Sequence, residues 1–475
     1  MAKKSTRREF IARATAGAAA LSAGGSLISA KAEERLEEMI NARQAPATGR
    51  VLGANDRVNF GFIGMGGRMG EHTGYVATRN KNQGDVQAVA VCDIYEKNKR
   101  RGQAQTKVSD KDIHHDYREL CARKDVDAVV IATPDHWHTR HAMEALNRGK
   151  HVYLEKPMTY TIDEARELAR RVKATGLQLQ VGSQHLSDIQ HWKAREVIQS
   201  GLIGKVLWAS TSYSRNTPIG EWNYYKIDPD EEANEKTIDW KAFLGYAKKR
   251  PFDKDRFFRW RKYWDYSGGI ATDLFYHRLS PLMFSIGSPE FPTRVTAQGG
   301  IFAPVEGDIR EVPDTYFTTI EFPGKYAVML GSSMPNATGI PEMIRGAKGS
   351  IYLKTREFQN NRAIRVVPER PYREEFNKKM GGNELVIDVS GNTLGGDGAE
   401  RPTEQFTTHH MANFINAIRG TEKVHFDAEL GYKAMVAIRL GVDAYRSGHT
   451  MYFDAKREKA TTRPMPMASP TPPKR

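Results

Sequence analysis

Residues 58–70 read VNFGFI-GMGGRMG, in which an apolar run, Val58–Ile63, is followed at once by a glycine-rich loop, Gly64 to Gly70. The apolar run predicts a buried strand, and the loop opens a helix that the pattern predicts over 67–77. Glycines at such a turn let the backbone approach a pyrophosphate, whose charge the N-terminus of the helix stabilises. The third glycine lies one place later than in the usual GxGxxG pattern, so neighbouring segments must support this assignment. The candidate cofactor-binding residues in the loop are Gly64, Met65, Gly66, Gly67 and Arg68.

An acidic residue lies where the second predicted strand, 86–92, ends. Asp93 follows Gly70 by 23 residues, a position from which a carboxylate accepts hydrogen bonds from an adenosine ribose. Its negative charge repels a 2′-phosphate, which favours NAD over NADP as the cofactor. The alternative is a glycine turn with Asp93 capping the next helix.

Short apolar runs alternate with helical periods through the first third of the chain. This alternation predicts an α/β domain with a doubly wound parallel sheet over 57–182. Beyond it, an α+β domain with a large, mostly antiparallel sheet is expected over 183–455. The predicted strands are 58–63, 86–92, 128–133 and 151–154, then 293–298, 316–322, 326–330 and 350–353. The predicted helices are 67–77, 95–105, 117–123, 139–147 and 162–174, then 189–200, 274–286, 408–418 and 430–446.

Polar residues follow two further strands of the predicted parallel sheet. Loops at the carboxyl ends of such strands contact ligands. A lysine delivered to this crevice can hydrogen-bond a substrate hydroxyl and assist its proton transfer. The candidates here are Thr133, Pro134, His136 and His138 after one strand, and Glu155 and Lys156, followed by Pro157, after the other.

A glycine pair, Gly268 and Gly269, precedes a predicted helix that carries Asp273 and His277. At spacing i and i+4 the two side chains share a helix face. A carboxylate beside an imidazole orients it and raises its basicity, which suits a general base for an alcohol. The alternative is a structural pair on the protein surface.

Aromatic residues concentrate between the two predicted domains, where four of the seven tryptophans lie. Aromatic faces beside arginines suit stacking against the C–H faces of sugars, and a packed core or a subunit interface is the alternative. The candidate substrate-binding residues are Tyr213, Arg259, Trp260, Trp264 and Tyr276.

From about residue 57 to residue 453, these motifs in this order resemble the Gfo/Idh/MocA oxidoreductases, the family of glucose–fructose oxidoreductase and inositol dehydrogenase. The resemblance implies a catalytic trio of Lys156, Asp273 and His277. His277 would take or return the hydroxyl proton while hydride passes to or from the nicotinamide, Asp273 would orient His277, and Lys156 would assist. Two departures from the family pattern, Leu274-Phe275-Tyr276 and Ser280, would reshape the substrate pocket.

The N-terminus, residues 1–32, contains Thr6-Arg7-Arg8-Glu9-Phe10-Ile11, which is typical of a twin-arginine export signal. We expect a linker or arm over 33–56 and a periplasmic or otherwise exported protein; the stretch 239–269 is similar to that of the exported subgroup. The signal is too short and too weakly apolar for a stable membrane span. Because free NAD(P)H is scarce outside the cytoplasm, the cofactor is expected to stay bound and to be regenerated in place.

The formal charge of +14 is concentrated at the two ends of the chain. Residues 1–32 and 456–475 each carry a net +5, which leaves only +4 for residues 33–455. This excludes a basic nucleic-acid groove. Proline richness predicts a disordered tail over 456–475. Cys92 and Cys121 are expected as buried free thiols, and the histidine spacings predict no metal site.

Three functions fit the sequence. The first is an NAD(P)-dependent oxidoreductase acting on a sugar, polyol or glycoside hydroxyl. The second is an NAD-dependent glycoside hydrolase or lyase that works by transient oxidation and needs a further base for a ring C–H proton, for which Tyr213 or Tyr276 are candidates. The third is a non-catalytic cofactor- and sugar-binding protein. A homodimer or homotetramer is expected.

Overall fold

A computed structural model of the chain describes residues 57–287, 289–353, 363–389 and 404–464. These residues all belong to one compact unit. The predicted export signal at 1–32 and the predicted arm at 33–56 lie outside them.

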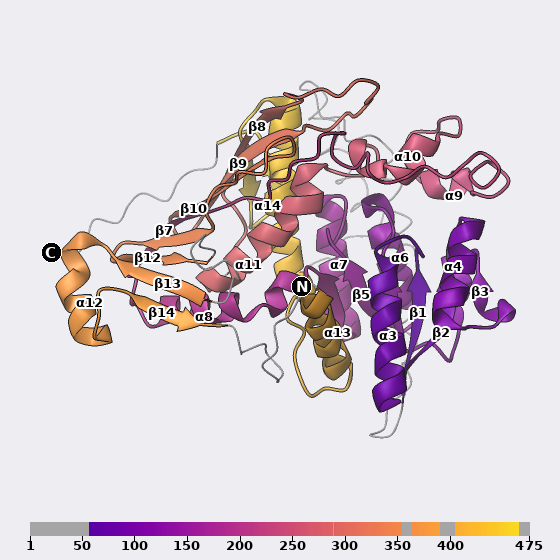
Figure 1. The fold of residues 1–475 in the computed structure, drawn as a ribbon, viewed down its shortest axis with the longest axis horizontal. Coiled ribbons are helices and arrows are strands. Elements are labelled where there is room, and N and C mark those ends of the chain that lie inside the picture. The colour runs from indigo at the N-terminus through magenta and orange to yellow at the C-terminus, as the bar shows by residue number, and fades with distance from the viewer. Residues whose placement is uncertain (1–56, 288, 354–362, 390–403, 465–475) are drawn as a thin grey trace, which may run out of the picture. The chain divides into compact units, whose positions relative to one another are not determined.

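The first part of the chain folds into a six-stranded sheet in the order β3-β2-β1-β4-β5-β6, and every neighbouring pair is parallel (Figure 1). This confirms the doubly wound α/β class. Strand order reverses between β1 and β4, which opens a crevice at their carboxyl ends. The strands are β1 (Val58–Ile63), β2 (Val86–Cys92), β3 (Ile113–His114), β4 (Ala128–Ile131), β5 (His151–Glu155) and β6 (Leu179–Gly182). The helices are α3 (Met69–Gln83), α4 (Glu96–Thr106), α5 (Tyr117–Ala122), α6 (Asp135–Asn147) and α7 (Ile162–Thr175).

Helix boundaries depart from the sequence prediction where a local backbone signal decides them. Helix α6 begins at Asp135 rather than at 139, because the extended Pro134 (φ −61°, ψ 151°) directly precedes it. Helix α3 continues past residue 77 to Gln83, where Gly84 in the left-handed region (φ 69°) ends it.

The second part of the chain forms a ten-stranded sheet in the order β14-β13-β12-β11-β7-β10-β9-β8-β15-β16. Only β7 and β10 pair in parallel, so the predicted large, mostly antiparallel sheet is confirmed. Its strands are β7 (Val206–Thr211), β8 (Arg294–Gly300), β9 (Thr315–Phe322), β10 (Tyr326–Ser333), β11 (Met343–Gly346), β12 (Gly349–Tyr352), β13 (Ala363–Pro368), β14 (Leu385–Asp388), β15 (Met451–Asp454) and β16 (Lys459–Thr461). The accompanying helices are α8 (Ile189–Gln199), α9 (Trp240–Leu244), α10 (Lys254–Phe258), α11 (Tyr276–Ile286), α12 (Arg373–Met380), α13 (Glu404–Ile418) and α14 (Ala428–Ser447).

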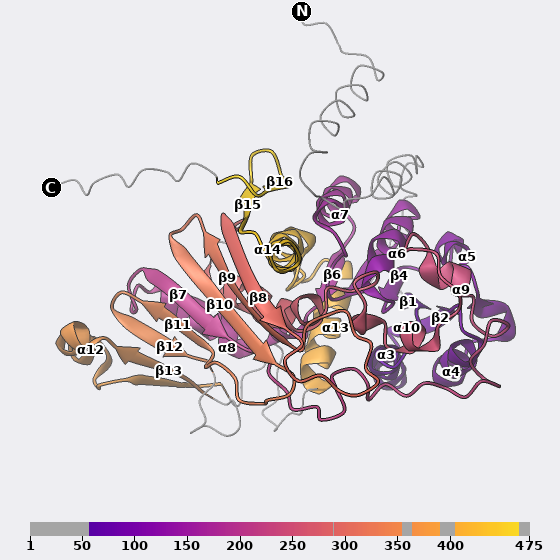
Figure 2. The same cartoon turned by 90° about the horizontal axis from the view of Figure 1, so that it is seen from above.

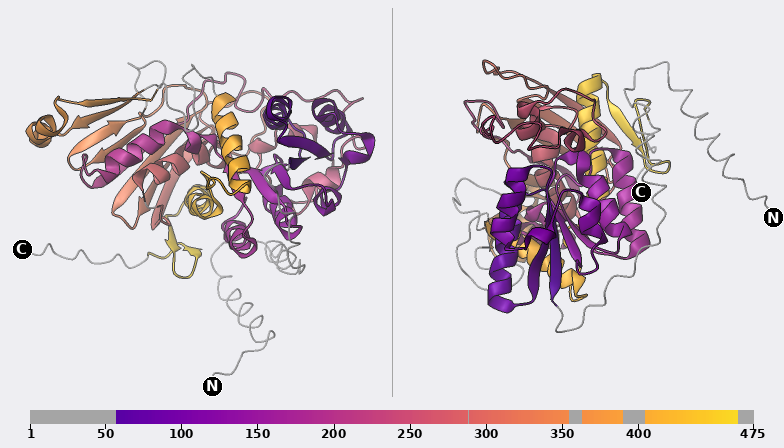
Figure 3. Two further views of the ribbon diagram at one scale, coloured as in Figure 1. Left: turned by 90° about the horizontal axis from the view of Figure 1, so that it is seen from below. Right: turned by 90° about the vertical axis from the view of Figure 1, so that its right-hand side faces the viewer.

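Helix α14 joins the two sheets, because it packs against β8 on one side and α7 on the other (Figure 2). Helix α11 packs against α8 and α14, and α8 lies across the large sheet near β13 (Figure 3). Gly431 of α14 packs closely against residues of the first domain. A Cβ there would meet Met158 Sδ at 2.7 Å and Val181 Cγ2 at 3.1 Å.

The predicted start of the disordered tail, residue 456, lies too early in the chain. Residues 459–461 form β16, which pairs antiparallel with β15. Glu458, in the turn between them, accepts from Tyr432 and pairs with Arg170 of α7. The prolines that suggested a tail begin only at Pro464, which explains why composition misplaced the boundary.

Gly431→Ala should lower the free energy of unfolding by about 1–3 kcal/mol, because the new methyl group has no room between α14 and Met158. The matched control is Gly74→Ala in α3, where a Cβ meets nothing within 4 Å. There the gain in helix propensity should stabilise the protein by up to about 1 kcal/mol. Urea unfolding measures the free energy of unfolding of each variant. Equal changes in the two variants would contradict the packing argument.

Candidate active site

The glycine loop lies between β1 and α3 and faces the turn after β4. Gly64 has φ +86°, and a Cβ there would meet Thr133 Cγ2 at 2.7 Å and Ala132 O at 2.8 Å, so only glycine fits. By contrast, a Cβ on Gly66 or Gly67 meets nothing within 4 Å. Open space over two glycines at the start of α3 suits the close approach of a pyrophosphate. The Met65 side chain is fully buried, so only its backbone can take part.

Asp93 ties the end of β2 to this loop. Its Oδ2 accepts from Met65 N at 2.6 Å and its Oδ1 from Tyr95 N at 2.9 Å. Burial raises the pKa of Asp93 from its ordinary value, against the hydrogen bonds that favour the carboxylate. The guanidinium of Arg101, beside Asp93, is committed to Met65 O and to Asn98. The group at the end of β2 is therefore a carboxylate and not a free cation, which favours NAD over NADP.

Glu155, at the end of β5, gathers a buried polar cluster under the glycine loop. Its Oε1 accepts from Arg68 Nε and from His72 Nε2, both at 2.8 Å. Although burial opposes ionisation, these two partners hold the pKa of Glu155 well below its ordinary value, and burial lowers the pKa of His72. Arg68 and Glu155, both cofactor-binding candidates, are thus in direct contact.

Lys156 reaches from the parallel sheet to the second domain. Its Nζ donates to Asp273 Oδ1 at 2.6 Å and to Asp273 O at 2.5 Å. Arg261 Nε donates to the same Oδ1 at 3.0 Å, and Trp222 Nε1 donates to Oδ2 at 3.0 Å. Despite its burial, Asp273 has a pKa far below the ordinary value because of Lys156 and Arg261. Asp273 is therefore a permanent carboxylate and not a proton carrier.

No hydrogen bond joins Asp273 to His277 among the described residues, so the expectation that Asp273 orients His277 was wrong. Residues Ala271–Phe275 form a π-helical turn rather than the start of an α-helix. The three donors above occupy the Asp273 carboxylate, so His277 is oriented by another residue. Its Nδ1 lies 3.1 Å from Ser183 Oγ, and Ser183 lies 3.5 Å from Ser280 Oγ.

His277 is positioned to take a proton through its other nitrogen. In the part of the chain that the structure describes, Nε2 has no hydrogen-bond partner, and the Tyr213 ring centroid lies 6.4 Å from the His277 ring. Burial and the Lys156 cation hold the pKa of His277 well below its ordinary value. At neutral pH the ring is therefore neutral and able to accept a hydroxyl proton.

Asp135, at the first position of α6, is a second buried carboxyl in the same site. It is 2% exposed, and its Oδ2 accepts from Thr272 Oγ1 at 3.0 Å. Burial raises the pKa of Asp135 to about 7, although the cations of Lys156 and Arg261 oppose the shift. The two carboxyls therefore differ, since Asp273 is always ionised and Asp135 titrates near neutral pH.

The two histidines predicted to bind the cofactor, His136 and His138, form hydrogen bonds with backbone carbonyl oxygens instead. His138 lies between the carbonyl oxygens of Pro157 (2.6 Å) and Thr133 (2.8 Å), so it fastens the turn after β5 to the turn after β4. Burial lowers its pKa to about 4, so it is neutral and donates to one of the two. His136 Nε2 lies 2.8 Å from Phe243 O.

Two predicted substrate-binding residues, Tyr276 and Trp264, lie away from the site. Tyr276 is fully buried and donates to Gly431 O at 2.9 Å, because the π-helical turn directs it into the core. Trp264 packs beside Tyr445 of α14. The assignments of these two residues to substrate binding were wrong. Arg259 donates to Asn223 O at 2.8 Å and to Tyr225 O at 3.0 Å, so it holds the loop that carries Tyr225.

The other two substrate candidates belong to a row of aromatic rings and guanidinium groups beside Asp273 and His277. The guanidinium carbons lie over the faces of the rings: Arg261 is 4.1 Å from the Trp260 centroid and 5.3 Å from the Tyr225 centroid, and Arg278 is 4.5 Å from the Tyr213 centroid. Tyr224 and Tyr225 are 41% and 37% exposed, with centroids 4.7 Å apart. The members of this aromatic–arginine row are Trp260, Arg261, Tyr225, Tyr224, Arg215, Tyr213 and Arg278.

Trp240, Phe243, Tyr263 and Tyr266 pack with Leu244 in a small separate core, so part of the aromatic stretch is core, and sugar binding by the rest stays a prediction. Four residues were missed as site residues: Trp222, Arg261, Asp135 and Ser183. Asp135 lies inside the quoted Thr133–His138 motif and Ser183 directly follows β6, so a strand-end rule applied to every strand would have found both.

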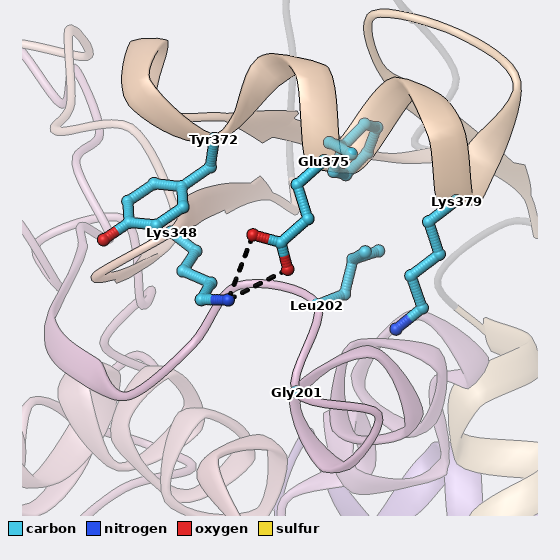
Figure 4. A pocket seen from close by; sticks show the side chains of 7 residues that line it. Gly201, Leu202, Lys348, Tyr372, Glu375 and Lys379 are labelled. Atoms are coloured by element: carbon cyan, nitrogen blue, oxygen red, sulfur yellow. Dashed lines mark hydrogen bonds and ion pairs between the residues drawn. The ribbon is translucent and has the colours of Figure 1, made fainter.

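Other candidate sites are weaker. Cys92 and Cys121 are free and buried, as predicted. Within 57–464, gaps aside, no cluster of three or more His, Cys, Asp or Glu residues suits a metal ion, and no helix there has the length and apolarity to span a membrane. A small hollow near α12 contains the Lys348–Glu375 ion pair and none of the predicted site residues (Figure 4).

Comparison with known proteins assigns both domains to one oxidoreductase family. Residues 58–183 match the model of an oxidoreductase family's NAD-binding Rossmann fold, and residues 244–453 match the C-terminal alpha/beta domain of the same oxidoreductase family. The N-terminal domain is an NAD-binding Rossmann domain.

Two curated relatives have names that refer to carbohydrates. A glycosyl hydrolase family 109 protein of Solibacter usitatus is 32% identical over 36% of this chain and 42% of its own length. A 2,7-anhydro-N-acetylneuraminate hydratase of Mediterraneibacter gnavus is 27% identical over 62% of this chain and 66% of its own length. The chain therefore matches less than two thirds of either relative.

A solved levoglucosan dehydrogenase, in complex with NADH and levoglucosan, has the same fold. Its TM-score is 0.62 at 18% identity, over 86% of this chain and 100% of that one.

Asp135→Asn should flatten the pH dependence of folding. Because the folded-state pKa of Asp135 is raised to about 7 from an ordinary value of 3.8, the stability it contributes is present below about pH 4 and is lost as pH rises through 7. Relative to wild type, the variant should gain stability on the order of a few kcal/mol between pH 4.5 and 7.5. Urea unfolding at several pH values measures this, with the exposed Asp230→Asn as control. A difference from wild type that does not change with pH would contradict the assignment.

Proposed function

The chain belongs to the Gfo/Idh/MocA oxidoreductase family, and we propose that it is an NAD-dependent oxidoreductase acting on a hydroxyl group of a sugar, polyol or glycoside. We further propose that the cofactor stays bound through the cycle and is regenerated in place.

One observation carries the proposal: Lys156, at the carboxyl end of β5, meets Asp273 from the second domain at 2.6 Å. The contact lies at the sheet edge where the glycine loop leaves room for a dinucleotide. A cation, a fixed carboxylate and a neutral histidine thus come from two domains to one place, which is what proton removal from an alcohol beside a nicotinamide requires. The same assembly disfavours a purely non-catalytic binding protein.

His277, Lys156 and Asp273 have different roles in the reaction of a substrate hydroxyl. His277 Nε2 accepts the hydroxyl proton, and Ser183 holds the ring through Nδ1. Lys156 Nζ has two protons engaged by Asp273, and its third is free to hydrogen-bond the hydroxyl oxygen. Asp273 neutralises Lys156 and Arg261, so that the two cations can coexist in a buried site. When bound, NAD supplies the hydride acceptor.

The aromatic–arginine row supports a carbohydrate substrate. Its rings offer flat apolar faces for sugar C–H groups, and its guanidinium groups offer donors for hydroxyls. The names of the relatives, a glycosyl hydrolase, an anhydro-sugar hydratase and a levoglucosan dehydrogenase, point the same way.

The second candidate function is an NAD-dependent glycoside hydrolase or lyase that works by transient oxidation. The 32% identical glycosyl hydrolase relative favours it. The additional base it needs would be Tyr213, whose ring lies beside His277. Tyr276, the other tyrosine considered for this role, is buried in the core.

Purified protein should release NAD on denaturation, and one sugar of a panel should raise the absorbance of the native protein at 340 nm. Lys156→Met keeps the length of the side chain but removes its donor, so turnover should fall by about 10²–10⁴-fold with NAD still bound. Lys348→Ala, remote from the site, is the control. Aglycone release without net reduction would favour the glycosidase, whereas protein that neither contains nor binds NAD would overturn the proposal.

We propose that the protein is exported by the twin-arginine route and works in the periplasm. Support comes from Arg7 and Arg8 within the basic N-terminal segment. The double substitution Arg7→Lys/Arg8→Lys keeps the charge but removes the paired arginines, so the protein should stay in the cytoplasmic fraction. Export of the variant at the wild-type level would contradict this route.

We propose a homodimer or homotetramer formed through the open face of the large sheet. Trp208 on β7, Phe317 on β9 and Met329 on β10 lie on these three adjacent strands and are 39%, 46% and 36% exposed. Light scattering should give a mass of at least two chains, and Phe317→Glu should lower it. Ile219→Glu, at a residue that is 56% exposed but lies outside the sheet, should not lower it. A monomeric wild type would end this proposal.

A further inference from the structure

The second domain sends residues 226–258 across the first domain; we call this segment, which contains α9 and α10, the roof. Figure 1 shows α9 and α10 at the end of the parallel sheet, beside α4 and α6. The sequence predicts substrate binding, a packed core or a subunit interface for this aromatic region, and none of the three addresses its hydrogen bonds to the loops of the Rossmann domain.

One edge of the roof is fastened directly after Asp93. Residues 95 and 238 form an antiparallel bridge, in which Glu96 N donates to Thr237 O and Asp239 N donates to Ile94 O, both at 3.0 Å. Tyr95 itself donates through its backbone to Asp93 Oδ1. The attachment is thus one hydrogen bond away from Asp93, the carboxylate predicted to bind the adenosine ribose.

Side chains strengthen the same edge. Asp228 accepts from Tyr95 Oη at 2.8 Å and from Lys97 Nζ at 2.9 Å. Tyr95, Ala233 and Ile238 are each about 1% exposed and form a small apolar cluster. His115, after β3, lies 2.9 Å from Asp239 Oδ2.

The opposite edge is fastened after β4, at the start of α6. Phe243 O accepts from Trp137 Nε1 and lies equally close, 2.8 Å, to His136 Nε2. The Arg140 guanidinium lies 3.2 Å from the Tyr246 ring centroid. Gly245 fits tightly, because a Cβ there would lie 2.5 Å from the Trp137 ring.

We infer that the roof is part of the dinucleotide-binding site and retains the adenosine half of NAD by closing the crevice between the loops after β2 and β4. In an open Rossmann domain these loops face solvent at the carboxyl edge, where the ligand enters and leaves. Here the roof bridges them, so a bound dinucleotide leaves only after one attachment opens. This inference rests on the proposed binding of NAD and gives the retention of the cofactor a physical cause.

The test measures cofactor exchange rather than activity. Protein loaded with isotopically labelled NAD is chased with excess unlabelled NAD, and the bound label is followed over time. Asp228→Ala removes the acceptor shared by Tyr95 and Lys97, so the exchange rate should rise about tenfold or more. Tyr95→Phe keeps the ring and removes one hydrogen bond, so its effect should be smaller. Lys348→Ala, which breaks the exposed ion pair with Glu375 (Figure 4), should stay within about twofold of wild type.

Hydrogen exchange at the Glu96 and Asp239 amides shows whether a substitution has opened the roof. If these amides stay protected in Asp228→Ala, the exchange experiment uses the variant Ile238→Asp instead, because that substitution puts a charge into the buried cluster. Unchanged NAD exchange in a folded variant whose amides are deprotected overturns the inference. If the wild-type protein binds no NAD, the proposed function itself is contradicted. If it binds NAD but releases it as fast as the opened variants do, only the inference that the roof retains NAD is overturned.

Discussion

The Asp273 carboxylate is the constraint on which the rest of the site depends. Lys156 and Arg261 are buried beside it, and two cations cannot share a water-poor space without an anion. Each of these groups comes from a different segment: the end of β5, the stretch before the π-helical turn, and the turn itself. The site therefore exists only when the two domains are packed together, and α14, which packs against both β8 and α7, is one of the elements that hold them so.

Backbone conformations that cost free energy gather around this carboxylate. Trp222, which donates to Asp273, has φ +67°, a value that bulky residues rarely adopt. Its neighbours hold it there: Arg310 donates to Glu221 O at 2.9 Å, and Asn223 donates to Asp308 at 3.0 Å. Lys262, 1% exposed, adds ion pairs to Asp255 and Asp308. A π-helical turn carries Asp273, as such turns often do at functional sites. The surrounding network thus stabilises a geometry that local preferences oppose.

The elements with strong local signals could be predicted from the sequence. The strand and glycine loop at 58–70, Asp93 after β2 and Lys156 after β5 all follow from apolar runs and the residues that end them. The separation of Asp273 from His277 could not be predicted, because the expected pairing assumed a regular α-helix. The chain instead forms a π-helical turn, and Asp273 within it binds Lys156, more than a hundred residues away in the sequence. Tyr276 was misplaced for the same reason. Trp222 and the roof are defined by contacts between distant segments, for which the chain carries no periodic pattern.

Both cysteines lie inside the Rossmann core, and burial raises the pKa of each thiol well above its ordinary value. Reaction with maleimides or with another thiol requires an accessible thiolate, so neither cysteine should react with such reagents in the folded protein. A cysteine introduced at any exposed position would then be the one reactive thiol among the described residues. The molecule therefore accepts a spin label or a fluorophore, for example on the roof, without removal of its natural cysteines.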